Sequence, residues 1–463
     1  MSVEKSVESG NTAQGFEGGK ALRGTVPRSS HGDWSPAPGR PDPVETIVSQ
    51  DRSRVEWLVP IRHWRMAQSP FSFYRGGAKI MAQDLSTTPT TGLDVQLCGD
   101  AHLSNFGVYG SPSRDLVFDI NDFDETLPGP WEWDVKRLAA SFAVVARHND
   151  YGSEDEADLA ARAVASYRKA MTQFAGMHYL DVWYSHLRIE DIEAAFRNQL
   201  TKKERRAGRT FAEKARSKNS VHALRKLAED SGDGYRIVAQ APLIVPLCDI
   251  AAEADPEEVE RYVTEGFDQY LASVPDHLRV LLRRFDYCDL ALKVVGVGSV
   301  GTRCAIVLLQ GRDAGEPFFL QIKEATDSVL SEHLPQTVYE HQGQRVVVGQ
   351  RLMQSESDGF LGWTTGQSGT HYFWRQFKDM KGSLEVDGAA LAELRRYAGL
   401  CGWTLARAHA RSGDAQAIAG YLGSGNRFDR GIADFSVAYA DQNERDHAAF
   451  IAAIESGRIT AHE

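Results

Sequence analysis

A glycine-rich segment in the C-terminal half of the chain limits the folds that this sequence can adopt. Residues 296–301 read GVGSVG and match the spacing G-x-G-x-x-G. In a dinucleotide-binding fold this spacing lies between a strand and a helix. Here residues 292–295 precede it and the β-branched run 302–309 follows it, so both flanks favour strands. The segment therefore predicts a β-hairpin, whose backbone N–H groups can lie over phosphates.

The hairpin belongs to a β-rich region that we expect to extend over residues 285–385. Apolar runs that alternate or are β-branched predict strands at 303–309, 318–323 and 372–376. Lys323 ends the second of these runs. An isolated lysine on a strand normally faces solvent, but after a G-x-G-x-x-G hairpin it becomes a candidate for the α- and β-phosphates of a nucleotide.

Helical spacing of apolar residues dominates the rest of the chain. It runs through most of residues 46–284, where two short strand-like runs at 93–98 and 116–120 interrupt it, and resumes in 386–463. Residues 1–45 are rich in Gly, Ser, Pro and charge and lack an apolar period, which predicts a disordered N-terminal tail. The pattern predicts an α+β fold with a small antiparallel β-rich part and a larger helical part.

The charge balance and the cysteine content exclude several classes of function. The chain carries 52 Lys and Arg against 63 Asp and Glu, a net charge of −11, which argues against non-specific nucleic-acid binding and against docking on an anionic membrane. No apolar run reaches the roughly 18 residues that a membrane span needs. The five cysteines are scattered without a C-x-x-C pair, which is typical of a reducing compartment. We expect a cytoplasmic protein with no nucleic-acid or membrane partner.

The first segment that could carry chemistry follows the strand-like run 93–98. Residues 98–107 read CGDAHLSNFG and include Asp100, His102 and Asn105. Five residues apart in a tight loop, Asp100 can point a carboxylate at an attacking hydroxyl while the amide oxygen of Asn105 binds a hard divalent cation. Asp and Asn in loops also commonly cap helices and turns, so the spacing alone leaves both interpretations open. His102 has no second histidine at ligand spacing.

The second segment is strongly acidic and follows the strand-like run 116–120. It contains Asp119, Asp122, Asp124 and Glu125. Like charges so close repel each other, and a bound Mg²⁺ is the simplest way to neutralise them. An acidic surface turn is the alternative interpretation.

Together these segments resemble protein-kinase-like phosphotransferases, in style most closely the aminoglycoside phosphotransferases. Residues 99–105, GDAHLSN, are similar to the G-D-x-H-x-x-N catalytic loop of that family. There the glycine loop and the lysine precede the catalytic loop, whereas here they follow it. A circular permutation reconciles the order, with residues 389–410 as the helix that precedes the catalytic loop. The resemblance implies a permuted protein-kinase-like two-lobe fold: a small antiparallel β lobe at 285–385, and a larger helical lobe from 46–284 and 386–463.

The resemblance also implies Mg²⁺-dependent transfer of a phosphoryl group from ATP to an unidentified hydroxyl on a small molecule or a protein. Asp100 would orient or deprotonate the acceptor, and Asn105 would hold the metal. Asp122 is similar to the aspartate of the family's metal motif, because Phe123 follows it directly, and would bridge Mg²⁺ to the phosphates. Asp119 stays a competitor, because its separation from Asp100 is nearer the usual one. Asp124 is a further candidate metal ligand.

The nucleotide would be held by the hairpin and the strand after it. The residues implied are Gly296, Gly298, Ser299, Gly301 and Lys323. Glu340 is the expected glutamate partner of Lys323, from its distance along the chain alone.

Several residues depart from the kinase-like pattern. Cys98 stands where the resembled families commonly carry His, so the support of the catalytic loop is altered. Asp134 either braces that loop from below or is a first-turn acid favoured by the helix dipole. Arg75 either pairs with a loop carboxylate or contacts the acceptor or a phosphate. Three polar residues that a kinase would not need lie at and just beyond the end of the 389–410 pattern: His409, Arg411 and Asp414.

From about residue 50 the chain is also similar to a bacterial family called domain of unknown function 2252. The phrases that carry this similarity lie at residues 69–76, 99–107, 121–126, 296–301, 408–414 and 439–442. Two other functions stay open beside the kinase-like one. A catalytically inactive nucleotide-binding regulator would keep the phosphate-binding residues without turnover. A metal-dependent hydrolase would require a closer cluster of His ligands.

Overall fold

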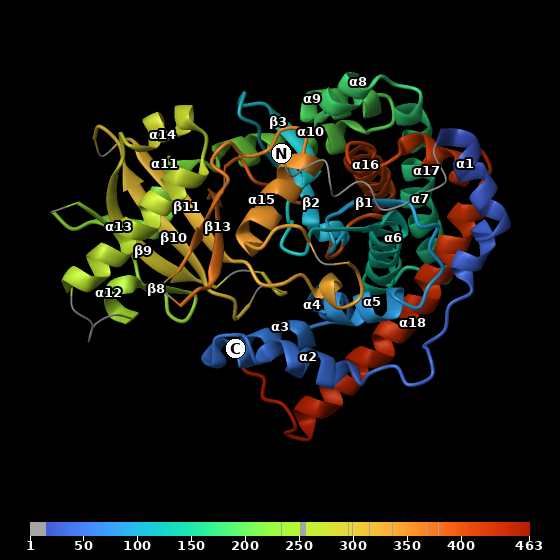
Figure 1. The fold of residues 1–463 in the computed structure, drawn as a ribbon, viewed down its shortest axis with the longest axis horizontal. Coiled ribbons are helices and arrows are strands. Elements are labelled where there is room, and N and C mark those ends of the chain that lie inside the picture. The colour runs from blue at the N-terminus through green and yellow to red at the C-terminus, as the bar shows by residue number, and fades with distance from the viewer. Residues whose placement is uncertain are drawn as a thin grey trace.

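The computed structural model describes residues 15–463 except 233, 251–255, 295, 299, 314, 336, 367 and 378. The chain has the expected α+β composition: it is mostly helical, with several small antiparallel sheets (Figure 1). Among the helices of these residues, none is both long enough and apolar enough to cross a membrane.

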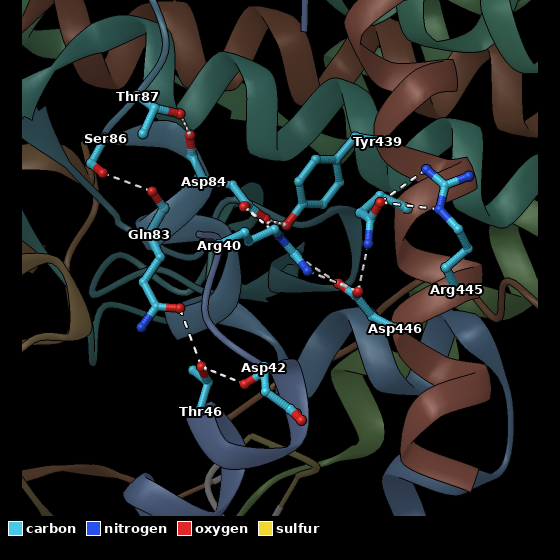
Figure 2. Close-up of polar contacts among 11 residues, drawn as sticks. Arg40, Asp42, Thr46, Gln83, Asp84, Ser86, Thr87, Tyr439, Arg445 and Asp446 are labelled. Atoms are coloured by element: carbon cyan, nitrogen blue, oxygen red, sulfur yellow. Dashed lines mark hydrogen bonds and ion pairs between the residues drawn. The ribbon is translucent and has the colours of Figure 1, made fainter. Parts of the chain in front are cut away.

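The N-terminal segment corrects the prediction of a disordered tail, because it is folded from residue 15 onward, whereas residues 1–14 lie outside the described residues. Arg23 donates to the carbonyl of Tyr421 at 2.9 Å. Arg40 bridges two acids, with Nε 2.7 Å from Asp84 and Nη2 2.6 Å from Asp446 (Figure 2). A segment held by polar contacts of this kind shows no apolar periodicity, so its composition predicted disorder. The segment comprises α1 (Gly15–Ala21), the 3₁₀ turns η1 (Leu22–Gly24) and η2 (Arg28–Gly32), and the start of α2 (Pro43–Asp51).

Short helices lead from this segment to the first strands. They are η3 (Glu56–Leu58), α3 (Val59–Ala67), α4 (Pro70–Gly76) and α5 (Ala78–Leu85). Helix α4 begins at Pro70 because proline suits the first helical position and the Ser69 hydroxyl accepts from the backbone N–H of Ser72 at 3.0 Å.

Two small sheets place the candidate loops next to each other. Strand β1 (Asp94–Leu97) pairs with β4 (Leu127–Pro130), and β2 (Phe106–Gly110) pairs with β3 (Leu116–Ile120), which also pairs with β5 (Leu187–Arg188). The loop from β1 to β2 includes η4 (Leu103–Asn105), and the loop from β3 to β4 contains the acidic segment. Because Phe106 lies opposite Ile120 and Leu97 opposite Leu127, both loops leave the sheets together.

The largest hydrophobic core lies among long helices from two separate stretches of the chain. Helices α6 (Trp131–His148) and α7 (Ser153–Ala175) pack with α16 (Leu391–Ala410), α17 (Ala415–Leu422) and α18 (Arg427–Glu455). Trp131 stacks on Tyr167 with ring centroids 5.6 Å apart. The helices after the β-rich region therefore complete the core that begins before it.

A six-stranded antiparallel sheet forms the β-rich part, on the left of Figure 1. Its strands lie in the order β12-β13-β11-β10-β9-β8. Their bounds are β8 (Ile244–Pro246), β9 (Asp286–Lys293), β10 (Cys304–Gln310), β11 (Pro317–Glu324), β12 (Gly362–Thr365) and β13 (His371–Gln376). Strands β9 and β10 are antiparallel neighbours joined by the glycine-rich segment, so the predicted hairpin is confirmed. The turn η5 (Val329–Glu332) and helix α15 (Gln342–Met353) follow β11.

The boundary predicted at residue 285 is wrong, because earlier residues belong to this β-rich unit. Strand β8 forms an edge of the sheet, and helices pack on both faces: Leu224 of α11 (Ser220–Leu227) joins the cluster around Phe319, and Tyr270 of α13 (Pro256–Ser273) stacks on Trp374 at 4.5 Å. The remaining elements of this region are α8 (Tyr179–Tyr184), α9 (Ile189–Phe196), α10 (Lys202–Ser217), β6 (Ala228–Asp230), β7 (Tyr235–Ile237), α12 (Leu247–Ile250) and α14 (Asp276–Leu282).

Candidate functional site

A single cleft of about 860 Å³ brings together segments that lie far apart in the sequence. We call it the carboxylate cleft, after Asp100, Asp122, Asp124 and Glu125, which line it. The other predicted site residues on its walls are Arg75, His102, Asn105, Gly296, Gly298 and Glu340. Ser299 lies outside the described residues.

The loop between β1 and β2 holds Asp100 in a fixed position. Arg137 Nε donates to one carboxylate oxygen of Asp100 at 2.9 Å, and Nη2 of the same arginine lies 2.8 Å from that oxygen. His102 Nε2 lies 3.5 Å from the other carboxylate oxygen. Asn105 donates its amide N–H to the Asp100 carbonyl at 2.8 Å, so its amide oxygen is available as an acceptor or a metal ligand. Gly99 is required before this aspartate, because its φ is +83° and a Cβ there would lie 2.3 Å from the Glu125 carbonyl.

Asp134 supports this loop from below, which was the first of the two interpretations of this residue. Its carboxylate accepts from the backbone N–H groups of Cys98 at 2.8 Å and Gly99 at 3.0 Å. His409 Nε2 lies 3.2 Å from the same carboxylate, and the other ring nitrogen is 2.9 Å from the Tyr167 hydroxyl. Asp134 and His409 are both buried, so they act on the cleft only through the loop.

Lys323 reaches the acidic segment from strand β11. Its ammonium forms an ion pair with Asp124 and lies 3.8 Å from Asp122. Burial alone would raise the pKa of Asp122, but Lys323 and then Arg375 outweigh it and hold the pKa well below its usual range. Burial and the charge of Asp122 raise the pKa of Asp124. Glu340, the expected partner of Lys323, is exposed and forms no ion pair with it in the described structure, so the two aspartates take that place.

Of the two aspartates considered for the metal, Asp122 faces the cleft and Asp119 does not. Asp119 is buried on β3, where it forms an ion pair with Arg407 and accepts from the Ile120 N–H at 2.8 Å. The charge of Asp119 is therefore already compensated by Arg407, inside the fold and away from the cleft.

Two further candidates lie outside the cleft. Arg411 donates to the Leu352 carbonyl at 2.7 Å and lies 3.8 Å over the ring of Trp183. Asp414 caps α17 by accepting from the Ala417 N–H at 2.9 Å. Both side chains therefore make contacts outside the cleft.

The glycine-rich segment is tied to the helical part of the molecule at both ends. Gly296 and Gly301 have φ values of +69° and +91°. Arg65 donates to the Gly296 carbonyl at 2.6 Å, and the Val55 N–H donates to the Gly301 carbonyl at 2.8 Å. The segment therefore closes over the cleft from the sheet to the helices.

A second cavity of about 750 Å³ shares Gly296 with the carboxylate cleft. Its walls include Gln321 and two cations that the sequence had not indicated, Arg375 and Lys381. Burial and the charge of Arg375 lower the pKa of Lys381 to about 7. The only sequence signal for Arg375 was its place in a predicted strand; the pairing that sets it opposite Gln321 depends on the fold.

In the part of the chain that the structure describes, no three His, Cys, Asp or Glu side chains are grouped so that they could hold a metal ion by themselves. Oxygen ligands of the kind that Mg²⁺ prefers, from Asn105, Asp122 and Asp124, nevertheless line one cleft. A metal held there would need ligands from a bound molecule or from water.

Searches for relatives give the chain a family. Comparison with curated proteins and with solved structures gave no match. The model of the family DUF2252, described as an uncharacterized protein conserved in bacteria, matches residues 54–453. This match covers the lining of the carboxylate cleft except for Ser49, Gln50 and Ser53. The chain therefore belongs to the DUF2252 family.

Proposed function

We propose that this protein transfers a phosphoryl group from ATP to a hydroxyl acceptor, with Mg²⁺, in a circularly permuted kinase-like fold. One observation carries the proposal. Asp100, Asn105 and Asp122 line one cleft with Gly296 and Gly298, and Lys323, about 200 residues further along the chain, lies 3.8 Å from Asp122.

The order of elements in the β-rich part supports the nucleotide side of the proposal. The glycine-rich segment joins β9 to β10, Lys323 lies on the next strand, and α15 follows that strand. Kinase-like enzymes likewise place the phosphate-binding lysine on the strand after the glycine hairpin and a helix after that strand.

The end of helix α16 supports the permutation. The Ser412 hydroxyl, just beyond this helix, accepts from the backbone N–H of Gln96 on β1 at 3.0 Å. Strand β1 leads directly into the Asp100 loop. The helix expected before the catalytic loop thus ends beside the strand that begins it, although the chain connects them the other way round.

The residues of the cleft suit a reaction that depends on positioning. Arg137 fixes the Asp100 carboxylate, which would orient the acceptor hydroxyl and receive its proton. Burial lowers the pKa of His102 to about 4, so this side chain is neutral at pH 7. Asn105, Asp122 and Asp124 would hold Mg²⁺, which would neutralise charge on the phosphates.

The neighbouring cavity offers room for the rest of a nucleotide. It combines apolar and aromatic side chains, such as Phe318 and Phe360, with the amides of Gln321 and Asn121. A pocket of this size and mixed character is typical of small-molecule and cofactor sites.

Labelled ATP tests the proposal directly. Binding, self-modification and phosphate release are measured with and without Mg²⁺ for the wild type, Asp100→Ala and Asp122→Ala. Asp276→Ala, at a side chain 94% exposed, is the control for loss of one acid. We expect Asp100→Ala to bind MgATP and lose turnover, and Asp122→Ala to lose the effect of Mg²⁺ on binding.

Two outcomes contradict the proposal. A wild type that neither binds ATP nor responds to Mg²⁺ removes the kinase-like function. Binding with the same negligible turnover in all four proteins would instead support an inactive nucleotide-binding regulator.

A further inference from the structure

Arg75 differs from the other Arg and Lys side chains that line the carboxylate cleft. Arg54 lies 4.0 Å from Asp51, and Lys79 forms an ion pair with Glu332 at 2.7 Å. Among the described residues, Arg75 forms no ion pair. The buried Nε atoms of Arg75 and Arg54 both have no hydrogen-bond partner, but Arg54 also donates from Nη1 to the Val300 carbonyl. Its guanidinium lies 6.0 Å from the ring of Phe71.

The acid that the sequence offered as a partner for Arg75 is already paired. Arg137 places both Nε and Nη2 against one oxygen of Asp100. Asp100 and Arg75 line the same cleft and interact only at longer range, where the carboxylate favours the charged guanidinium. The interpretation of Arg75 as the structural partner of a loop carboxylate therefore does not hold.

Arg75 also lies beneath the glycine-rich segment. A Cβ at Gly298 would be 3.4 Å from the Arg75 carbonyl, so the two backbones are close neighbours. The side chain is placed by the last turn of α4, whose start at Ser69 and Pro70 is fixed by capping. Arg75 is thus held between the hairpin and the Asp100 loop.

A guanidinium that is mostly removed from water and has no anionic partner is unfavourable for the protein alone. Its planar set of donors matches an oxyanion, which it can bind through two parallel hydrogen bonds. We propose that Arg75 binds an oxyanion in the carboxylate cleft beside Asp100. The ligand is the terminal phosphate of the nucleotide or an anionic group of the acceptor, an identification that rests on the proposed phosphotransferase function.

Calorimetry with three probes tests this site: inorganic phosphate on the nucleotide-free protein, MgADP and MgATP. Arg75→Met removes the guanidinium and keeps much of the apolar stem. Lys79→Met is the matched control, because it removes one positive charge from the same cleft at a residue that is already paired. We expect Arg75→Met to weaken phosphate binding at least about tenfold, as for loss of a charged hydrogen bond, and Lys79→Met to change it less than about threefold.

The nucleotide probes identify the source of the oxyanion. If it is the terminal phosphate, Arg75→Met weakens MgATP about tenfold and leaves MgADP unchanged. If it belongs to the acceptor, both nucleotides bind as in the wild type, and inorganic phosphate no longer binds to the MgADP-saturated variant. Arg75→Lys keeps the charge without the two-pronged geometry and provides the same comparison where Arg75→Met does not fold.

The inference is overturned if the Arg75 variants and the wild type respond alike to all three probes. A wild type that binds phosphate through Arg75 but does not bind MgATP would contradict the proposed function and leave the oxyanion site standing. A protein that binds MgATP but shows no effect of the Arg75 variants on any probe would contradict the oxyanion site and leave the proposed function standing.

Discussion

Lys323 on strand β11 forms an ion pair with Asp124, although 199 residues separate them in the sequence. The contact joins the six-stranded sheet to the loop between β3 and β4, and it brings the ammonium within 3.8 Å of Asp122 as well. With Arg375, this lysine offsets the burial and mutual repulsion that disfavour ionising both acids together.

Lys323→Met should destabilise the protein, because it removes the cation that lies nearest to Asp122 and Asp124. We expect the free energy of unfolding at pH 7 to fall by about 3 kcal/mol. The double variant Lys323→Met/Asp124→Asn should recover part of that loss. Urea denaturation of the single and double variants measures the coupling. Arg114→Met, at a pair whose arginine is 52% exposed, should cost less than about 1 kcal/mol. Strictly additive losses for Lys323 and Asp124 would contradict the prediction.

Asp119→Asn should affect stability rather than nucleotide binding. It leaves the buried charge of Arg407 unpaired, for which we expect a loss of about 3–5 kcal/mol in the free energy of unfolding. The affinity of the folded variant for MgATP should equal that of the wild type. Asp122→Asn should show the opposite pattern, with a smaller loss of stability and weaker Mg²⁺-dependent binding of ATP. Chemical denaturation and calorimetry on both variants check this, and exchanged phenotypes would reassign the metal ligand to Asp119.

Glu125 should make the stability of the nucleotide-free protein depend on pH. Burial raises the pKa of Glu125 to about 7, from a usual value of 4.5. Between these values the unfolded chain releases the proton and the folded chain keeps it. The contribution of Glu125 to stability is therefore full below about pH 4.5 and is lost as pH rises to about 7.

Glu125→Gln should remove this part of the pH dependence. The free energy of unfolding of the wild type and the variant is measured from pH 4 to 8, and the wild type should lose more stability between pH 4.5 and 7. Parallel curves for the two proteins would show that Glu125 is not the group responsible.

Arg40→Met tests whether the N-terminal segment belongs to the cooperative fold. The variant leaves two buried acids, Asp84 and Asp446, without their shared cation (Figure 2). We expect a loss of about 3 kcal/mol at pH 7 that becomes smaller at pH 5, as the acids take up protons. Arg445→Met is the control at the next, exposed position of α18, where Arg445 donates to Gln442, and it should stay within about 0.5 kcal/mol of the wild type. Thermal unfolding of both variants is measured at pH 7 and pH 5. If the unfolding midpoint of Arg40→Met equals that of the wild type, the N-terminal segment does not unfold cooperatively with the remainder of the protein.

Local patterns predicted the features that depend on local physics. The β-branched flanks of the glycine-rich segment predicted a hairpin instead of a strand–helix turn, and the pairing of β9 with β10 confirms it. The predicted partner of Lys323 was Glu340, from its distance along the chain. The fold instead places Asp124, from the loop between β3 and β4, next to this lysine. Arg375 and Lys381 were not identified as site residues for the same reason: they line a cavity only where separate elements meet.

The N-terminal segment shows a second limit of sequence patterns. Apolar periodicity detects elements that are held by a hydrophobic face. The contacts of Arg23 and Arg40 are polar and reach acids and carbonyls more than 40 residues away, so composition indicated disorder where the chain is folded.

The ties of the glycine-rich segment to Arg65 and Val55 have a kinetic consequence. A loop that is free at its tip can lift like a flap, whereas this one is fastened at Gly296 and Gly301 to residues near α3. For a ligand bound in the cleft as proposed, we expect Arg65→Met to change the rate of release, because the variant frees the Gly296 end of the segment.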